Sequence, residues 1–311
     1  MINMDSLLSP ESPELDVREL TRLAGFAKHL GKAPLQLHNR PQSGAHLTRM
    51  KGHGMEMLEV RQYHNNDELR HIDWRVSART GTTHTRVYAE EKEHSRLLVL
   101  TLSSAAYFGT KDTFISTRMV QLQTLIAWRT KLQNDKVGAY LQFGEQQYFL
   151  PVSNKGNHIN NLLSHFANAT RISHRYSNSI PATKPSPWKI LQKHATRQQQ
   201  IIICSDSREL SNDELTQLQI LAKHNTIHWI AIEDSRLAEL PEGKYCFEDI
   251  HGSKTIYANR ANIESSNQQK QRINLDIRHQ LNQIGVTYHW FALHESPVQM
   301  ARQLLFCGAL S

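Results

Sequence analysis

"RLLVLTLSS", residues 96–104, is a near-continuous apolar run of the length of one strand. Such a run is typical of a strand covered on both faces, because side chains on either side must avoid water. A second run of this kind, "QQIIICSDS", occupies residues 199–207. Together they predict a sheet whose centre is buried between two layers of helices.

The segments around these two runs alternate between helical and strand patterns. Helical periodicity marks residues 114–133, 157–169, 212–224, 261–284 and 297–308, with a shorter helix from Trp188, and strand patterns mark residues 136–143, 147–153, 226–234 and 287–293. Residues 136–153 resemble a strand pair with a short turn at Gly144 and Glu145. Strands alternating with helices predict an α/β fold of three layers around a mainly parallel sheet.

The first 95 residues have a different pattern of apolar residues. Residues 15–30 carry an apolar helical stripe that ends at Gly31, and residues 54–63 and 82–91 have strand patterns. We therefore expect two domains, with an N-terminal helix and strands in residues 1–95 and the α/β domain in residues 96–311.

Composition favours a soluble cytoplasmic protein. The chain has 311 residues, of which 39% are hydrophobic, and no apolar run approaches the roughly 18 residues that a membrane span needs. The N-terminal residues lack a basic segment before an apolar block, so no signal peptide is expected. Three widely spaced cysteines without a CxxC pair fit a reducing compartment.

The net charge of +7 is concentrated in two regions. Residues 146–205 contain no Asp or Glu, and residues 17–51 contain only Glu19. Such regions indicate an anionic partner or surface, which includes nucleic acid, or they are solvated helix faces without a partner.

Enzyme signatures are absent from the sequence. The segment from Gly25 to Ala33 fails as a P-loop, and neither a GxSxG nor an HExxH motif is present. We therefore predict a non-catalytic protein without a cofactor. The alternative is an active site that uses Asp67, His71 and Asp73 as acid and base.

Residues 52–91, "GHGMEMLEVRQYHNNDELRHIDWRVSARTGTTHTRVYAEE", carry a long motif. It resembles the signature of the domain of unknown function 58 family, whose members are often paired with MoxR-type AAA+ ATPases. The matching positions include Arg61, Tyr63, Asp67, Arg70, Asp73, Trp74, Ser77, Arg79, Arg86 and Glu91. Asn66 stands where the family favours Gly.

The resemblance implies a von Willebrand factor A-like fold in the second half of the chain, with a divalent ion bound at the C-terminal edge of the sheet. The family-type ligands Asp, Ser and Ser correspond here to Thr101, Ser103 and Ala105, whereas Asp206 keeps the later carboxylate. Magnesium needs charged or hard oxygen ligands. We therefore expect a degenerate metal-ion-dependent adhesion site that binds no metal.

Arginine and carboxylate are balanced in the motif, which a nucleic-acid stripe would not be. We interpret it as a charge-paired clasp between the N-terminal part and the α/β domain, with Asp73 and Arg79 among its members. Ile72, Trp74, Val76 and Ala78 alternate as in an extended segment with one packed side.

The resemblance implies an adaptor of a MoxR-type ATPase that helps to assemble or remodel a client complex. We expect the partner to dock at Ser103, Ser104 and Asp206, with Lys189 and Lys193 supplying positive charge. A nucleic-acid or anionic-surface binder that uses the two basic regions is the alternative function.

Overall fold

The computed structural model describes residues 8, 10, 12–31, 55–64, 67–90, 94–111, 113–176, 186–207, 209–239, 241–249 and 252–310. The chain divides into two units, of which Met1–Gln36 with His94–Ser311 form the first and Leu37–Glu93 the second. We call them the body and the hairpin unit.

The body is built on β3 (Ser95–Leu102), which carries the apolar run that opens the sequence analysis. Leu98, Leu100 and Leu102 join one hydrophobic core. Leu97 and Val99 join the other, because successive side chains of a strand point to opposite faces. The expected burial on both faces is confirmed.

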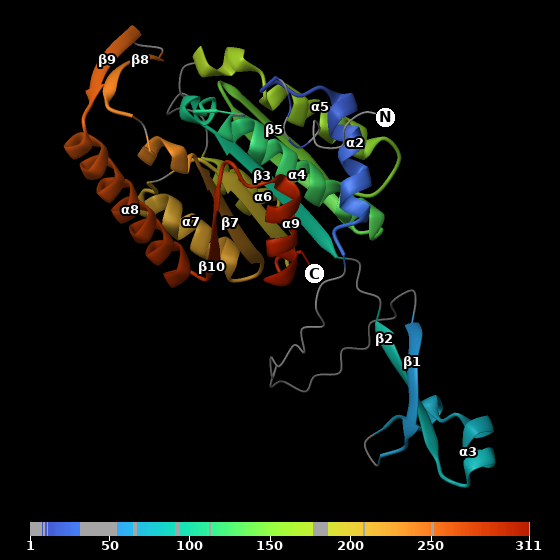
Figure 1. Ribbon diagram of the computed structural model, residues 1–311. Helices are drawn as coiled ribbons and strands as arrows, with labels where there is room; N and C mark the ends of the chain where they lie inside the picture. The colour runs from blue at the N-terminus through green and yellow to red at the C-terminus, as the bar shows by residue number, and fades with distance from the viewer. Residues whose placement is uncertain are drawn as a thin grey trace. The chain divides into compact units, whose positions relative to one another are not determined.

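The sheet of the body has six strands in the order β10-β7-β6-β3-β4-β5. Parallel pairing joins all neighbours except β5, which is antiparallel to β4. The other strands are β4 (Lys136–Phe143), β5 (Gln146–Ser153), β6 (Gln200–Ser205), β7 (Thr226–Glu233) and β10 (Val286–Ala292). The predicted fold class, three-layer α/β with a mainly parallel sheet, is confirmed (Figure 1).

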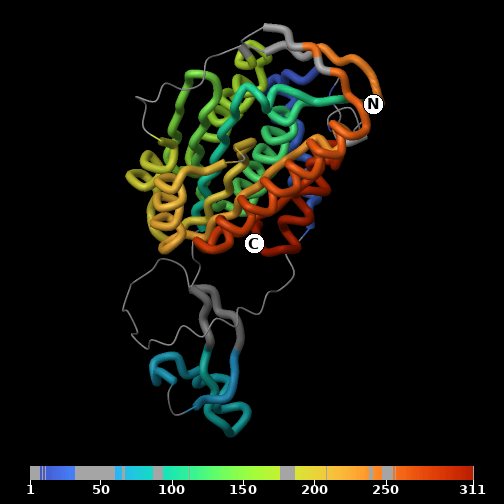
Figure 2. The backbone as a smooth tube through the Cα atoms, turned by 90° about the vertical axis from the view of Figure 1, so that its left-hand side faces the viewer, coloured from blue at the N-terminus to red at the C-terminus, as the bar shows by residue number. Residues whose placement is uncertain are grey.

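Helices cover both faces of this sheet (Figure 2). The core that contains Leu98 is shared with α2 (Val17–Lys28), α4 (Ile115–Leu132), α5 (His158–Ala169) and α9 (Pro297–Phe306). The core that contains Leu97 is shared with α6 (Pro187–His194), α7 (Asn212–Ala222) and α8 (Arg260–Gln283). Short 3-10 helices are η2 (Ser104–Ala106), η3 (Ile172–Tyr176) and η4 (Ser235–Glu239).

The turn between β4 and β5 lies where the sequence indicates it. Gly144 has φ of 53°, a left-handed conformation that glycine adopts without strain. Gly138 permits a close approach of the two strands, since a Cβ there would lie 2.8 Å from the carbonyl oxygen of Leu150.

The N-terminal helix α2 belongs to the body. The prediction that it forms one domain with the rest of residues 1–95 therefore needs correction. Leu20 and Leu23 are buried in the core beneath it. Trp128 Nε1 donates to the carbonyl oxygen of Leu20 at 3.0 Å, and Arg129 donates to that of Gly31 at 2.9 Å. The apolar stripe of α2 needs a covering surface, which α4 and α5 provide.

The hairpin unit consists of β1 (Met55–Gln62) and β2 (His84–Glu90), which pair antiparallel, with η1 (Leu69–His71) and α3 (Trp74–Thr80) between them. A separate antiparallel pair in the body, β8 (Gly243–Asp249) and β9 (Gly252–Ala258), has no counterpart in the sequence analysis. Across the residues described, we find no helix with both the length and the apolar character required to span a bilayer.

Two histidines, one buried and one half-buried, lie side by side on the neighbouring strands β7 and β10. His228 Nδ1 and His289 Nε2 are 3.1 Å apart, and His228 is only 6% exposed. Burial lowers the pKa of His228 to about 4, with further contributions from His289 and Arg96. Burial also lowers the pKa of His289. Both imidazoles are therefore neutral at pH 7.

This pair makes the fold sensitive to acid. Unfolded histidine binds a proton near pH 6.5, whereas folded His228 does so near pH 4. The stability from neutral His228 is therefore complete above pH 6.5 and falls progressively as the pH drops toward 4. We expect the free energy of unfolding to lose about 3 kcal/mol from this group across that window.

Urea unfolding at a series of pH values measures this loss. The variant His228→Gln should show a shallower decline between pH 6.5 and 4 than the parent chain. Equal slopes for the two proteins would contradict the assignment of this acid sensitivity to His228.

Candidate functional site

The parallel strands β3 and β6 end beside one another and bring two predicted site residues together. Ser103 follows β3 and Asp206 follows β6. The backbone N–H of Ser103 donates to Asp206 Oδ1 at 2.9 Å, and its hydroxyl donates to Oδ2 of the same carboxylate. Just before these residues in the two strands, the Thr101 hydroxyl of β3 donates to Ser205 Oγ of β6 at 2.7 Å. Hydroxyl and carboxylate groups at this edge are thus bonded to each other.

The Ser103 side chain also accepts a hydrogen bond at this edge. Its Oγ accepts the N–H of Ala105 at 3.1 Å and so caps η2, which begins at Ser104. The hydroxyl therefore links the helical turn after β3 to the carboxylate after β6. These hydrogen bonds hold the two loops together.

The residues at this edge do not fit the metal that the family resemblance implies. Thr101 supplies no charge, and Ala105 supplies no oxygen from its side chain. Among the described residues no group of three His, Cys, Asp or Glu side chains is arranged to hold an ion.

A small cavity of about 50 Å³ opens beside Asp206. A wider groove of about 610 Å³ adjoins it, since both are lined by Glu233, Asn274 and Tyr288. Asn274 Nδ2, on α8, donates to Glu233 Oε2 at 2.9 Å. Sequence reasoning missed these residues, although the position of Glu233 at the end of β7 was an available signal.

The groove has exposed apolar side chains on both of its walls. Leu275 of α8 is 64% exposed and Trp290 of β10 is 46% exposed. Large apolar side chains left in water beside a groove are a common mark of a binding surface.

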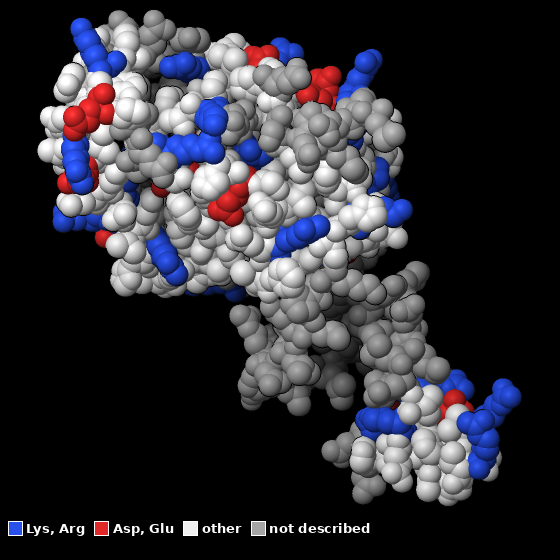
Figure 3. All heavy atoms as spheres, in the orientation of Figure 1, with Lys and Arg blue, Asp and Glu red and all other residues white. Residues whose placement is uncertain are grey.

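Lys189 and Lys193 lie one turn apart on α6, and both are exposed. The start of α6 is tied to α7, where Trp188 Nε1 donates to Glu214 Oε1 at 3.2 Å. Because α7 follows the C-terminal end of β6, Lys189 lies nearer to that edge than Lys193. On the face shown in Figure 3, Lys and Arg side chains are scattered over the body with few acidic groups between them.

In the hairpin unit, Asp73 is the N-cap residue of α3. Its Oδ1 accepts the N–H groups of Arg75 and Val76, each at 3.1 Å, and Oδ2 accepts from Arg86 Nε at 2.8 Å. The Arg86 guanidinium, followed by the N–H of Val76, lowers the pKa of the Asp73 carboxyl. The carboxylate is therefore charged when it caps the helix.

A second pair fixes the loop before η1. Arg61 binds Asp67 through both terminal nitrogens, at 2.7 and 2.8 Å, and the His64 N–H donates to the same carboxylate at 2.9 Å. This pairing lowers the pKa of Asp67. Arg70 pairs with Glu68. Tyr63 is half-buried, and Glu91 lies outside the described residues.

Two expectations about this motif need correction. Residues 74–80 form a helix, so the alternation of Ile72, Trp74, Val76 and Ala78 does not define one packed side of an extended segment. Asp73 pairs with Arg86, whereas Arg79 is exposed. The Arg61–Asp67 and Asp73–Arg86 pairs each join two residues of the hairpin unit, and the clasp between the two domains stays a prediction.

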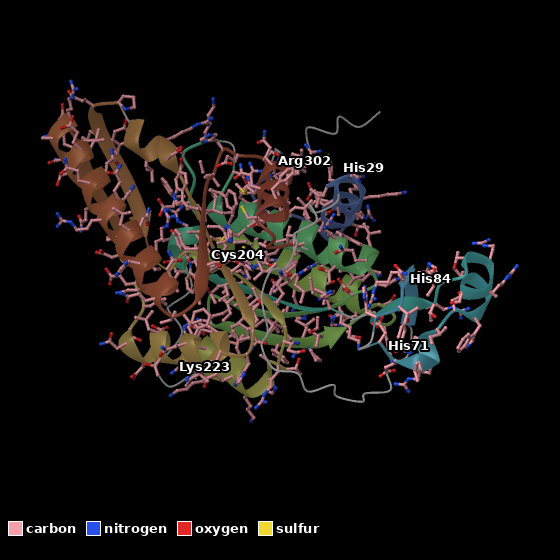
Figure 4. All side chains as sticks on the ribbon, turned by 90° about the horizontal axis from the view of Figure 1, so that it is seen from below. His29, His71, His84, Cys204, Lys223 and Arg302 are labelled. Atoms are coloured by element: carbon pink, nitrogen blue, oxygen red, sulfur yellow. The ribbon has the colours of Figure 1, made fainter. Side chains whose placement is uncertain are left out.

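The alternative active site gains no support from this geometry. Asp67 and Asp73 are held as charged carboxylates by arginines, which makes them poor proton donors at neutral pH. His71 and His84 also belong to the hairpin unit, whereas Cys204 lies in the interior of the body (Figure 4). Burial raises the pKa of Cys204 to about 12, so its thiol is inert at neutral pH.

Comparison with known proteins gives one family and several relatives. The family model described as "Protein of unknown function DUF58" matches residues 59–275. The uncharacterized proteins Rv1480 of Mycobacterium tuberculosis and Mb1516 of Mycobacterium bovis are each 25% identical over 199 residues. These matches cover 64% of this chain and 61% of each relative, which is less than two thirds of the relatives' length.

Two solved structures are similar. BatB from Bacteroides thetaiotaomicron, a conserved hypothetical protein, aligns with a TM-score of 0.44 and 14% identity and covers 68% of this chain and 96% of its own. The SpRpn10 VWA domain aligns with a TM-score of 0.39 and 10% identity, covering 68% and 95%.

The composition of the sheet edge predicts indifference to magnesium. Adding millimolar Mg²⁺ should leave the melting temperature of the chain unchanged, because Thr101 and Ala105 replace two ligands. The double variant Thr101→Asp/Ala105→Ser, which installs the missing carboxylate and hydroxyl, should gain a magnesium-dependent rise. A saturable rise of several degrees in the parent chain would contradict the prediction.

The contacts of Asp73 predict a local loss of stability when its side chain is removed. Asp73→Ala deletes the cap of α3 and removes the ion pair with Arg86. Amide hydrogen exchange within α3 should become roughly tenfold faster or more. Asp73→Ala/Arg86→Ala should be less damaging than the sum of the single variants. Arg79→Ala is the matched control, and an equal acceleration there would refute this assignment of roles.

Proposed function

Because the chain belongs to the DUF58 family of proteins of unknown function, we propose that it is a non-catalytic protein-interaction module and an adaptor of a MoxR-type AAA+ ATPase. In this role it helps to assemble or remodel a client complex. The partner comes from the family resemblance, and the docking surface comes from the geometry of the body.

The contact between Ser103 and Asp206 carries the proposal. In an open α/β sheet, ligands bind at the C-terminal ends of the strands. Here the Asp206 carboxylate accepts two hydrogen bonds from Ser103, which fixes the position of both groups at that edge. A partner that docks there meets a preformed polar edge and has no need of a bridging metal.

The adjoining surface offers both apolar area and charge. The groove beside Asp206 exposes Leu275 and Trp290, which suits the apolar anchor of a partner segment. The acid-free span 146–205 contributes exposed Lys189 and Lys193. We infer that the docking face of the ATPase is acidic, and charge steering would make association sensitive to salt.

Binding of nucleic acid or another anionic surface through residues 17–51 and 146–205 is the second candidate. Exposed Arg18, Arg22 and Lys28 on α2 favour it. It predicts a steep, linear fall of log affinity for nucleic acid with log salt concentration. Docking on a protein predicts a partner-specific interaction instead.

Pull-down of the cognate ATPase tests the docking edge. Lys189→Glu/Lys193→Glu should weaken capture about tenfold by placing negative charge against an acidic partner. Asp206→Ala should also weaken it, because the link between the loops after β3 and β6 is lost, whereas Asp206→Asn, which still accepts hydrogen bonds, should weaken it less.

The control reverses two charges elsewhere. Arg197 and Lys223 are exposed, precede β6 and β7, and therefore lie toward the opposite edge of the sheet. Arg197→Glu/Lys223→Glu should bind like the parent. If folded Lys189→Glu/Lys193→Glu and Asp206→Ala variants also bind like the parent, the docking face lies elsewhere. If the parent chain captures no ATPase, the adaptor role itself is wrong.

A further inference from the structure

α3 presents an outward face that its own fold does not use. Trp74, Arg75, Ala78 and Arg79 are all exposed, and the Trp74 side chain is 71% exposed. Their spacing places them along one side of the helix, with Trp74 over Ala78 and Arg75 over Arg79. We call these four residues the α3 face.

The bonds that hold α3 come from other residues. Asp73 caps its first turn, and the Ser77 hydroxyl donates to the Asp73 carbonyl at 2.8 Å and accepts the His84 N–H at 2.9 Å. Gly81 ends the helix in a left-handed conformation with φ of 71°. The long motif therefore has two parts, one that builds the hairpin unit and one that faces outward.

Charge on the α3 face is unbalanced, although the hairpin unit is not. Asp67 pairs with Arg61, Asp73 with Arg86, and Glu68 with Arg70. Among the side chains that the structure describes, neither Arg75 nor Arg79 forms an ion pair. Arginine side chains project from the hairpin unit in Figure 3. Two guanidinium groups one turn apart are suited to bind two carboxylates.

We propose that the α3 face is a second protein-binding surface and that its occupant is an acidic segment of another protein. Two carboxylates of that segment pair with Arg75 and Arg79, while an apolar side chain packs on the Trp74 ring. Tryptophan and arginine are among the residue types that contribute most to the binding energy at protein interfaces.

A protein partner fits better than a nucleic acid. Residues 55–90 contain Arg61, Arg70, Arg75, Arg79 and Arg86, and against them Glu56, Glu59, Asp67, Glu68, Asp73 and Glu90. Basic and acidic residues are thus nearly balanced, whereas a surface that binds a phosphate backbone would be strongly basic. A short acidic segment needs only the two arginines of the helix. The chain would then have two docking surfaces, one on the body and one on the hairpin unit.

The test uses the full chain and three fluorescently labelled peptides. The first peptide is helical, with glutamates four residues apart and leucines beside them, and the others carry lysine or glutamine in place of glutamate. Fluorescence anisotropy should show saturable binding of the glutamate peptide only. Trp74→Ala and Arg75→Glu/Arg79→Glu should each lower its affinity about tenfold or more.

Arg197→Glu/Lys223→Glu serves again as the charge control and should bind the glutamate peptide like the parent. Because Trp74 is exposed, Trp74→Ala should keep the melting temperature of the parent, which separates lost binding from lost folding. The proposal is overturned if the glutamate peptide does not bind, or if folded α3-face variants bind it unchanged. It is also overturned if a labelled single-stranded oligonucleotide binds more tightly than the peptide and loses affinity in the same variants.

Discussion

Two-sided burial of β3 is the constraint on which the body depends. Leu98, Leu100 and Leu102 pack into one core, and Leu97 and Val99 pack into the other, so helices must cover both faces at once. Parallel pairing of β3 with β4 and β6 then brings the C-terminal strand ends to one edge. Ser103 and Asp206 are 103 residues apart along the chain and meet there. The docking edge is therefore a product of core packing.

The carboxylates that the sequence singles out are used within the chain. Asp206 accepts from Ser103, Asp73 accepts from Arg86 and two backbone N–H groups, and Asp67 is bound by Arg61. These bonds organise loops and a helix start, and they leave no such carboxylate poised for proton transfer. At the proposed docking surfaces, the exposed groups are arginine, lysine and large apolar side chains. A binding role follows more readily from this division than a catalytic one.

Much of the body is predictable from sequence because its signals are apolar and periodic. The runs at β3 and β6 and the hairpin at Gly144 are local patterns with one good structural solution. Helix α3 was missed, although Asp73 before it and Gly81 after it are helix start and stop signals, because the alternation from Ile72 suggested extended chain. β8 and β9 have no continuous apolar run like that of β3, so the sequence gives no clear strand signal there. The pairing of Asp73 with Arg86 depends on the isolated bridge between Ile72 and Thr85 of β2, which sequence alone does not specify.

The packing of α2 has a consequence for how the chain is made. Leu20 and Leu23 leave the ribosome early, but their partners on α4 and α5 extend to Ala169. The Leu15 N–H also donates to Thr170 Oγ1, at 2.9 Å. The whole hairpin unit is therefore synthesised before α2 can dock, and closing that long loop has an entropic cost. During translation α2 stays uncovered until residue 170 has emerged, which makes it a natural surface for a chaperone in that interval.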